Sequence, residues 1–135
     1  ALYSDYGINV GFAYNRKEAK DHGEGGMLVG ASMKDGQRIL VVDDVITAGT
    51  AIRESYTMLK SIGAQISGVV IALDRAEKRS LDDPVSAVQA VQRDLSVSVI
   101  SIVNLPQLQL FLEKSPVYGD DVLNCVRDYR TDYGV

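Results

Sequence analysis

The sequence predicts an α/β fold with a mainly parallel sheet flanked by helices. Continuous apolar runs of strand length alternate with stretches in which apolar residues recur at helical spacing. The order strand–helix–strand–helix–strand is typical of a parallel sheet, because its crossover connections carry the helices. A chain of 135 residues suits one domain. Such a chain buries roughly two thirds of the surface that its unfolded form exposes. We therefore expect residues 1–135 to form a single domain.

The first elements of this pattern predict a hairpin. Residues 27–32 and 38–42 are rich in apolar side chains and flank Lys34-Asp35-Gly36, whose composition is typical of a tight turn. The run Ile39-Leu40-Val41-Val42 also indicates a strand that is buried on both faces. The hairpin would add an antiparallel pair to the parallel strands, so we expect a mixed sheet.

Helices and strands then alternate to the end of the chain. A helix is predicted over residues 50–62, with Gly63 at the usual stop position, and a strand over residues 69–73. Asp83-Pro84 indicates the next helix start, with Asp as the cap and Pro at the first helical position. A third parallel strand over residues 97–103 is followed by short helices around residues 108–112 and 122–129. Cys125 lies among the apolar positions of the last helix, so we expect a small core side chain.

Composition and charge exclude several classes of protein. The formal net charge of -4 argues against a general nucleic-acid-binding surface. The single cysteine excludes an intrachain disulfide, and the single histidine excludes a multi-histidine metal site. No apolar run reaches the ~18 residues that a membrane span requires, and the sequence shows no signal peptide. We therefore expect a cytoplasmic protein with neither nucleic-acid nor membrane partners.

Two acids and a loop of small residues follow the first parallel strand. After Val42 the chain reads Asp43-Asp44-Val45-Ile46-Thr47-Ala48-Gly49-Thr50-Ala51. The free amides and the dipole at a helix N-terminus favour an anion such as a phosphate monoester. The carboxylates can accept hydrogen bonds from vicinal hydroxyl groups, and a ribose 5-phosphate presents a phosphate beside a diol. The alternative interpretation is that Asp44 or Thr47 only caps the helix.

A basic segment precedes this loop. Residues 16–26 contain Arg16, Lys17, Lys20 and His22, and end in a glycine-rich stretch. The cations suit a polyanion, which they would hold through charge-assisted hydrogen bonds. The glycines give a permissive backbone, and a mobile loop of this kind can close over a reaction. The alternative is a solvated surface loop of mixed charge.

Arg75 follows Leu73-Asp74 at the end of the second parallel strand. Its guanidinium can grip a carboxylate or an imide edge through two hydrogen bonds. The alternative is a surface ion pair with Asp74 that contributes little. Two other nucleotide-binding motifs are absent from the sequence, because Gly49 is not followed by the Lys of a Walker loop and no G-x-G-x-x-G follows a strand.

Three stretches resemble orotate phosphoribosyltransferases of the type I phosphoribosyltransferase family. ILVVDDVITAGTA (residues 39–51) closely resembles the phosphoribosyl-diphosphate motif of the type I family. FAYNRKEAKDHGEGG (residues 12–26) is similar to the catalytic flexible loop of the orotate enzymes, and Leu73-Asp74-Arg75 stands where they place an orotate-gripping arginine. The resemblance covers essentially the whole chain and implies the type I phosphoribosyltransferase fold.

The resemblance also implies an activity. The family transfers the ribose 5-phosphate of phosphoribosyl diphosphate to orotate, giving orotidine 5'-monophosphate and diphosphate in UMP biosynthesis, and it requires Mg²⁺. Catalytic roles are implied for Lys20, Arg16, His22 and Asp44, and orotate contacts for Thr47 and Arg75. The residues implied to bind phosphoribosyl diphosphate are Arg16, Lys17, Lys20, His22, Asp43, Asp44, Val45, Ile46, Thr47, Ala48, Gly49, Thr50 and Ala51. Mg²⁺ would be held mainly by substrate, with Asp44 contributing through water.

The resemblance implies a homodimer in which loop 16–26 reaches the neighbouring subunit. The family also has a preceding region with a base pocket and a second diphosphate loop, so we expect Ala1 to lie part-way into the native protein. Two other functions stay open. One is a non-catalytic phosphoribosyltransferase-like regulator. The other is a receiver-type signalling domain, in which the acid pair would work with a phosphorylatable Asp74.

Overall fold

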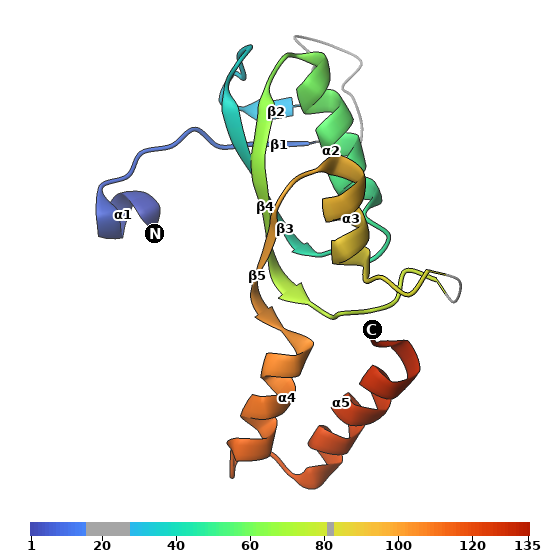
Figure 1. The fold of residues 1–135 in the computed structure, drawn as a ribbon. Helices are drawn as coiled ribbons and strands as arrows, with labels where there is room; N and C mark the ends of the chain where they lie inside the picture. The colour runs from blue at the N-terminus through green and yellow to red at the C-terminus, as the bar shows by residue number, and fades with distance from the viewer. Residues whose placement is uncertain (16–27, 81–82) are drawn as a thin grey trace. The chain divides into compact units, whose positions relative to one another are not determined.

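The computed structural model describes residues 1–15, 28–80 and 83–135 (Figure 1). The chain divides into two compact units, Ala1–Lys34 and Asp35–Val135. In the first unit, α1 (Leu2–Tyr6) precedes β1 (Ala13–Asn15), which pairs antiparallel with β2 (Leu28–Gly30). The second unit holds all the described candidate site residues.

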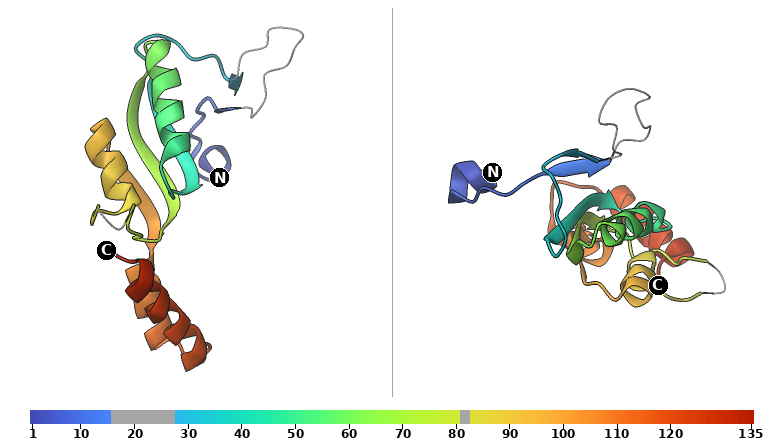
Figure 2. Two further views of the ribbon diagram at one scale, coloured as in Figure 1. Left: turned by 90° about the vertical axis from the view of Figure 1, so that its right-hand side faces the viewer. Right: turned by 90° about the horizontal axis from the view of Figure 1, so that it is seen from above.

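The second unit is built on a parallel sheet. Its strands are β3 (Arg38–Val45), β4 (Gln65–Asp74) and β5 (Val99–Asn104), with β4 in the centre and parallel to both neighbours. The helices α2 (Thr50–Ser61) and α3 (Ala87–Leu95) form the crossovers and pack against each other, while α4 (Leu105–Lys114) packs against α5 (Asp120–Tyr133) (Figures 1 and 2). The predicted α/β fold with a parallel sheet flanked by helices is confirmed. The predicted burial of β3 on both faces is wrong, because side chains alternate between the two faces of a strand and those of Leu40 and Val42 are exposed.

The core of this unit lies between the sheet and the two crossover helices. Val69 and Ile71 of β4 are buried against residues of α2 and α3, among them Ile52 and Val91. Ile46, in the loop after β3, joins the same cluster. The core therefore reaches the carboxyl end of the strands and anchors the base of the loop that follows β3.

The predicted hairpin is wrong. β2 pairs with β1, residue 27 lies outside the described residues, and the sheet of β3, β4 and β5 is parallel throughout. The turn itself forms, with Gly36 at φ 72°. However, the Gly36 amide donates to the Gly63 carbonyl at 3.0 Å, and the Gln65 amide donates to the Gln37 carbonyl at 2.8 Å. These bonds attach the turn to the α2–β4 connection, so β3 enters the sheet beside β4.

The predicted start of α3 is also wrong. The N-cap is Ser86, whose hydroxyl accepts a hydrogen bond from the Gln89 amide at 3.0 Å. In return, the Gln89 side chain accepts from the Ser86 amide at 2.8 Å. Asp83 instead forms an ion pair with Arg93, at 3.5 Å.

The last helix differs from expectation in one residue. Cys125 is exposed, not part of the core, because Leu123 is the buried residue of α5.

No helix within residues 1–15, 28–80 and 83–135 is both long enough and apolar enough to cross a membrane.

Candidate functional site

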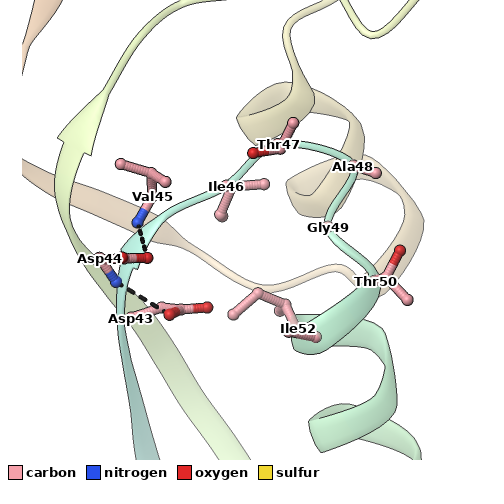
Figure 3. A pocket seen from close by; sticks show the side chains of 10 residues that line it. Asp43, Asp44, Val45, Ile46, Thr47, Ala48, Gly49, Thr50 and Ile52 are labelled. Atoms are coloured by element: carbon pink, nitrogen blue, oxygen red, sulfur yellow. Dashed lines mark hydrogen bonds between the residues drawn. The ribbon is translucent and has the colours of Figure 1, made fainter.

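Residues 43–52 line a hollow at the carboxyl end of β3 with a cavity volume of about 420 Å³ (Figure 3). The strand is longer than predicted and includes both acids, because Asp43 stays in register with Ile71 of β4. The Ile46 side chain is buried in the core, so a ligand in the hollow would meet the backbone of this residue. Thr47, Ala48 and Thr50 are exposed.

The two carboxylates are held by local hydrogen bonds. One oxygen of Asp43 accepts from the Asp44 amide at 3.0 Å, and one oxygen of Asp44 accepts from the Val45 amide at 2.6 Å (Figure 3). The second oxygen of each carboxylate has no hydrogen-bond partner among the described residues, 1–15, 28–80 and 83–135. Each acid therefore keeps one oxygen for a ligand's hydroxyl group or for a metal-bound water.

The N-terminus of α2 faces this hollow without a cap. Its N-cap is Gly49, and no described side chain bonds the first amides of the helix. The first helical hydrogen bond runs from the Arg53 amide to the Gly49 carbonyl at 3.0 Å, which leaves the amides of residues 50–52 for another acceptor. The interpretation in which Asp44 or Thr47 only caps the helix is therefore wrong. Uncapped amides and the helix dipole suit an anion.

Gly49 is required by its surroundings. Its φ of 76° is left-handed, a conformation in which a side chain is disfavoured. A Cβ there would lie 2.5 Å from Val91 Cγ2 and 2.6 Å from Arg53 Nη1. The loop backbone therefore packs directly on α3 and on the Arg53 side chain.

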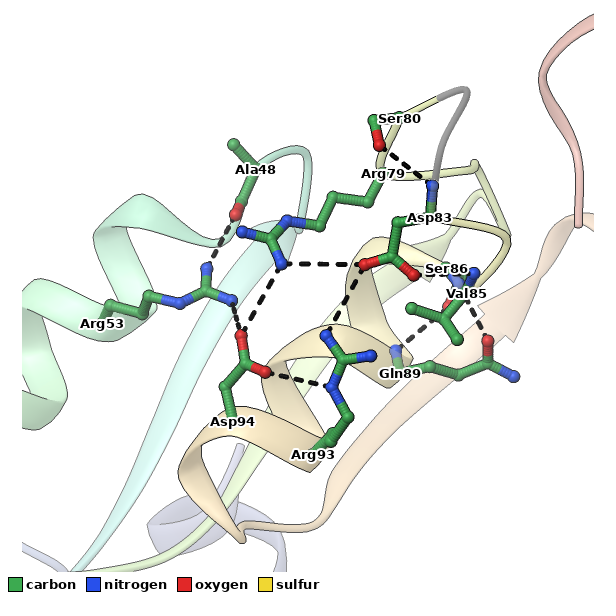
Figure 4. A network of polar contacts seen from close by, with 10 residues as sticks. All are labelled: Ala48, Arg53, Arg79, Ser80, Asp83, Val85, Ser86, Gln89, Arg93 and Asp94. Carbon is green, nitrogen blue, oxygen red and sulfur yellow. Dashed lines mark hydrogen bonds and ion pairs between the residues drawn. The ribbon is translucent and has the colours of Figure 1, made fainter.

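Arg53 links the loop to α3, a role that the sequence analysis missed. It donates to the Ala48 carbonyl at 2.8 Å and to an Asp94 carboxylate oxygen at 2.7 Å (Figure 4). Arg93 donates to the other oxygen of Asp94 at 3.2 Å. Arg79 Nη1 lies 3.8 Å from the Asp94 oxygen that Arg53 contacts. The hydrogen bonds from Arg53 and then Arg93 hold the pKa of Asp94 below its usual value. The helical spacing of Arg53 gave no indication of this contact.

Arg75 joins the ends of β3 and β4. Its Nη2 donates to the Thr47 hydroxyl at 2.9 Å, and its Nε lies 3.0 Å from Glu77 Oε1. The alternative pairing with Asp74 is wrong, because an Asp74 oxygen accepts from the Ala76 amide at 2.8 Å. A second cavity of about 260 Å³ opens here, and its lining residues are Thr47, Arg75, Glu77, Lys78, Tyr129 and Tyr133.

The structure thus brings the predicted residues Asp43, Asp44, 45–51 and Arg75 to one edge of the sheet. The predicted residues Arg16, Lys17, Lys20 and His22 lie outside the described residues. Within residues 1–15, 28–80 and 83–135 there is no cluster of three or more His, Cys, Asp or Glu side chains suited to a metal ion.

The acid pair and the uncapped small-residue loop lie at the same strand end of a three-stranded parallel sheet. This arrangement suits a protein of the class that binds sugar phosphates. The sequence profile of the phosphoribosyl transferase domain matches residues 5–103, so the chain belongs to the phosphoribosyltransferase family. Orotate phosphoribosyltransferase of Neisseria meningitidis is 49% identical over 134 residues, which are 99% of this chain and 61% of that protein. The chain thus spans about 61% of the length of the curated relatives that it matches.

Solved structures agree with the family and its fold. The crystal structure of orotate phosphoribosyltransferase from Francisella tularensis has a TM-score of 0.79 and 34% identity, over 99% of this chain and 61% of that chain. The enzyme of Mycobacterium tuberculosis in complex with 5-phospho-α-D-ribosyl 1-diphosphate has a TM-score of 0.57 and 25% identity, over 75% and 51% of the two chains. The resemblance to the type I phosphoribosyltransferase fold is confirmed.

Proposed function

We propose that the protein is an orotate phosphoribosyltransferase. It transfers the 5-phosphoribosyl group of phosphoribosyl diphosphate to orotate and releases orotidine 5'-monophosphate and diphosphate. The observation that carries the proposal is the Arg75–Thr47 hydrogen bond, which joins a guanidinium to the loop beside the acid pair. The names of the relatives support the same substrate pair. The family match over residues 5–103 crosses the boundary between the two units, which supports a single phosphoribosyltransferase core over residues 1–135.

Each part of the hollow suits one part of the sugar phosphate. The 5-phosphate accepts hydrogen bonds from the free amides and hydroxyl groups of residues 47–51, at the positive end of α2. The 2- and 3-hydroxyl groups donate to the free oxygens of Asp43 and Asp44. Because a carboxylate repels phosphate, the same two acids orient the sugar with its phosphate toward the helix.

The reaction breaks the bond between ribose C1 and the diphosphate oxygen and forms a bond from C1 to a ring nitrogen of orotate, which loses its proton. Positive charge develops on the sugar, and the Asp44 carboxylate stabilises it. Arg16, Lys20 and His22 stabilise the departing diphosphate, and Lys20 or His22 assists the proton transfer. Arg75, with Thr47, grips the orotate carboxylate or the imide edge.

The donor set fits a magnesium ion that is held mainly by substrate. Asp44 keeps one carboxylate oxygen free, and the described residues provide no three-carboxylate cage that would hold the metal alone. Asp44 would contact the ion through water. Bound Mg²⁺ neutralises the diphosphate charge.

The basic loop completes the site in this proposal. Residues 16–26 carry the cations and reach the active site of the neighbouring subunit, so the functional unit is a homodimer. The cytoplasmic location stays a prediction from composition.

Titration calorimetry with phosphoribosyl diphosphate, with and without Mg²⁺, tests the sugar-phosphate site first. We expect binding that strengthens with Mg²⁺, and formation of orotidine 5'-monophosphate once orotate is added. Ribose 5-phosphate should bind without Mg²⁺, because it lacks the diphosphate. Absence of binding by both sugar phosphates would contradict the proposal.

The same assays separate the alternatives. A protein that binds phosphoribosyl diphosphate but never converts orotate would be a non-catalytic regulator. Phosphate transfer to Asp74 from a small phosphodonor would indicate a receiver domain, and we expect none, because that reading leaves the loop of residues 47–51 without a role.

A further inference from the structure

We propose that Glu77 is a positioning residue that fixes the Arg75 guanidinium for carboxylate recognition, and that Tyr129 holds Glu77 in place. The inference rests on the proposed function, because it concerns the arginine that would grip orotate. It adds two residues from outside the recognised motifs and makes α5 part of the base site.

The backbone brings Arg75 and Glu77 together. Ala76 between them has φ 51°, a left-handed conformation that is unfavourable for a residue with a side chain. An Asp74 carboxylate oxygen accepts a hydrogen bond from the Ala76 amide at 2.8 Å and stabilises this turn. As a result Arg75 Nε and Glu77 Oε1 lie 3.0 Å apart.

Glu77 is itself fixed by the end of the chain. The Tyr129 hydroxyl donates to the same oxygen, Oε1, that faces Arg75. Glu77 also forms an antiparallel bridge with Gly134, the Lys78 amide donates to the Tyr133 carbonyl at 2.8 Å, and the Val135 amide donates to the Ala76 carbonyl at 2.9 Å. The carboxylate is 17% exposed, against 30% for the arginine, so it is the more sheltered partner.

The three nitrogens of the Arg75 guanidinium have different surroundings, and these indicate which of them a ligand would meet. Nε is buried and forms an ion pair with Glu77 Oε1 at 3.0 Å but no hydrogen bond to any described residue. Nη2 donates to Thr47, while Nη1 has no hydrogen bond or ion pair with any described residue. Arg75 is therefore held from two sides with the Nη1 end still available. A flexible arginine would lose side-chain freedom when it binds a carboxylate, and Glu77 has already restricted that freedom. Glu77 should thus increase the preference for a ligand that carries a carboxylate on its base.

Two nucleotides measure this preference directly. Orotidine and uridine 5'-monophosphate differ only in the base carboxylate, and ribose 5-phosphate reports on the phosphate loop alone. We expect Glu77→Gln to weaken orotidine 5'-monophosphate binding about tenfold, which corresponds to about 1.4 kcal/mol. The affinities for uridine 5'-monophosphate and ribose 5-phosphate should stay within about twofold, because the residues of the phosphate loop are unchanged.

Three further variants complete the experiment. Tyr129→Phe keeps the ring but removes the donor to Glu77, so it should show the same selective loss, about threefold. Glu113→Gln makes the same change in the Arg127 ion pair of α4 and α5, away from the site, and should change no affinity. In an Arg75→Met background, Glu77→Gln should have no further effect on the preference, since it acts through Arg75.

The outcomes are distinct. If Glu77→Gln and Tyr129→Phe weaken all three ligands equally, or weaken none, Glu77 does not position Arg75. If the native protein binds ribose 5-phosphate but does not prefer orotidine over uridine 5'-monophosphate, the orotate assignment fails, and the inference fails with it. If native selectivity is strong and the two variants keep it, only the inference fails.

Discussion

Substitution of Gly49 by alanine tests whether the packed loop is what makes the phosphate site. Gly49 combines a left-handed φ of 76° with a backbone that lies directly against α3. An added Cβ would be 2.5 Å from Val91 Cγ2 and 2.6 Å from Arg53 Nη1. Real Cβ atoms do not approach other atoms so closely, so the loop must move away from α3.

The size of the effect follows from two contributions. A left-handed alanine costs about 1–2 kcal/mol relative to glycine. Overpacking against Val91 and Arg53 adds about 1–3 kcal/mol. We therefore expect Gly49→Ala to lower the free energy of unfolding by about 2–5 kcal/mol, somewhat less if alanine restricts the unfolded chain.

Gly36→Ala is the matched control. Gly36 has nearly the same φ, 72°, and nothing lies within 4 Å of the position its Cβ would take. This variant should show only the backbone contribution, about 1–2 kcal/mol, and should keep its affinity for ribose 5-phosphate.

Urea unfolding and calorimetry with ribose 5-phosphate measure both effects. Gly49→Ala should be the less stable variant and should bind ribose 5-phosphate at least about tenfold more weakly, because the amides at the start of α2 are displaced. Equal unfolding free energies for the two variants would refute the close-packing argument. Unchanged ligand affinity in Gly49→Ala would refute the assignment of this loop to the phosphate.

Three further changes test other parts of the structure. Asp94→Asn should lower the urea midpoint at neutral pH, and the difference from the native protein should vanish as the pH falls through and below 3.8, because hydrogen bonds from Arg53 and Arg93 lower the pKa of Asp94. Urea titrations at acidic and neutral pH measure this difference in midpoint. A difference that grows in acid would contradict the linkage to Asp94. Asp44→Asn should weaken ribose 5-phosphate binding about tenfold in calorimetry, and unchanged affinity would count against the diol assignment. Lys20→Ala should reduce turnover of orotate far more than the affinity for phosphoribosyl diphosphate, and equal losses in the two assays would argue against a transition-state role.

The parts of the fold that the sequence predicted correctly are those with a strong local pattern. Continuous apolar runs placed the strands that contain Val41 and Val69. Burial of the first strand on both faces was predicted wrongly, because Leu40 and Val42 are exposed and only alternate residues of β3 pack toward the core. Helical spacing and Gly63 placed α2 to within a residue at its end. The acid pair and the small-residue loop also predicted the place of the hollow that residues 43–52 line.

The errors arose where two local signals competed. Asp83-Pro84 and Ser86 are both acceptable helix starts, and the reciprocal bonds between Ser86 and Gln89 decided between them. The turn at Gly36 was correctly recognised, but its hydrogen bond to Gly63 directed β3 toward β4. Which backbone a turn bonds is a property of the folded chain, so turn composition alone could not settle the strand pairing.

The contacts around Arg75 could not be predicted for a different reason. Asp74 is the adjacent acid and was the alternative partner, but its carboxylate accepts from the Ala76 amide, and Arg75 forms its ion pair with Glu77. Tyr129 comes from more than fifty residues further along the chain. Nothing in local composition connects such distant positions, and the packing of the chain end supplies the link.

The exposed thiol of α5 has a practical consequence for following this protein in solution. Cys125 is the single cysteine of the sequence, and it lies one helical turn before Tyr129. A maleimide fluorophore would therefore attach at one defined position, close to the tyrosine that contacts Glu77. Its emission can report the arrival and departure of a base in stopped-flow traces, without engineering a labelling site.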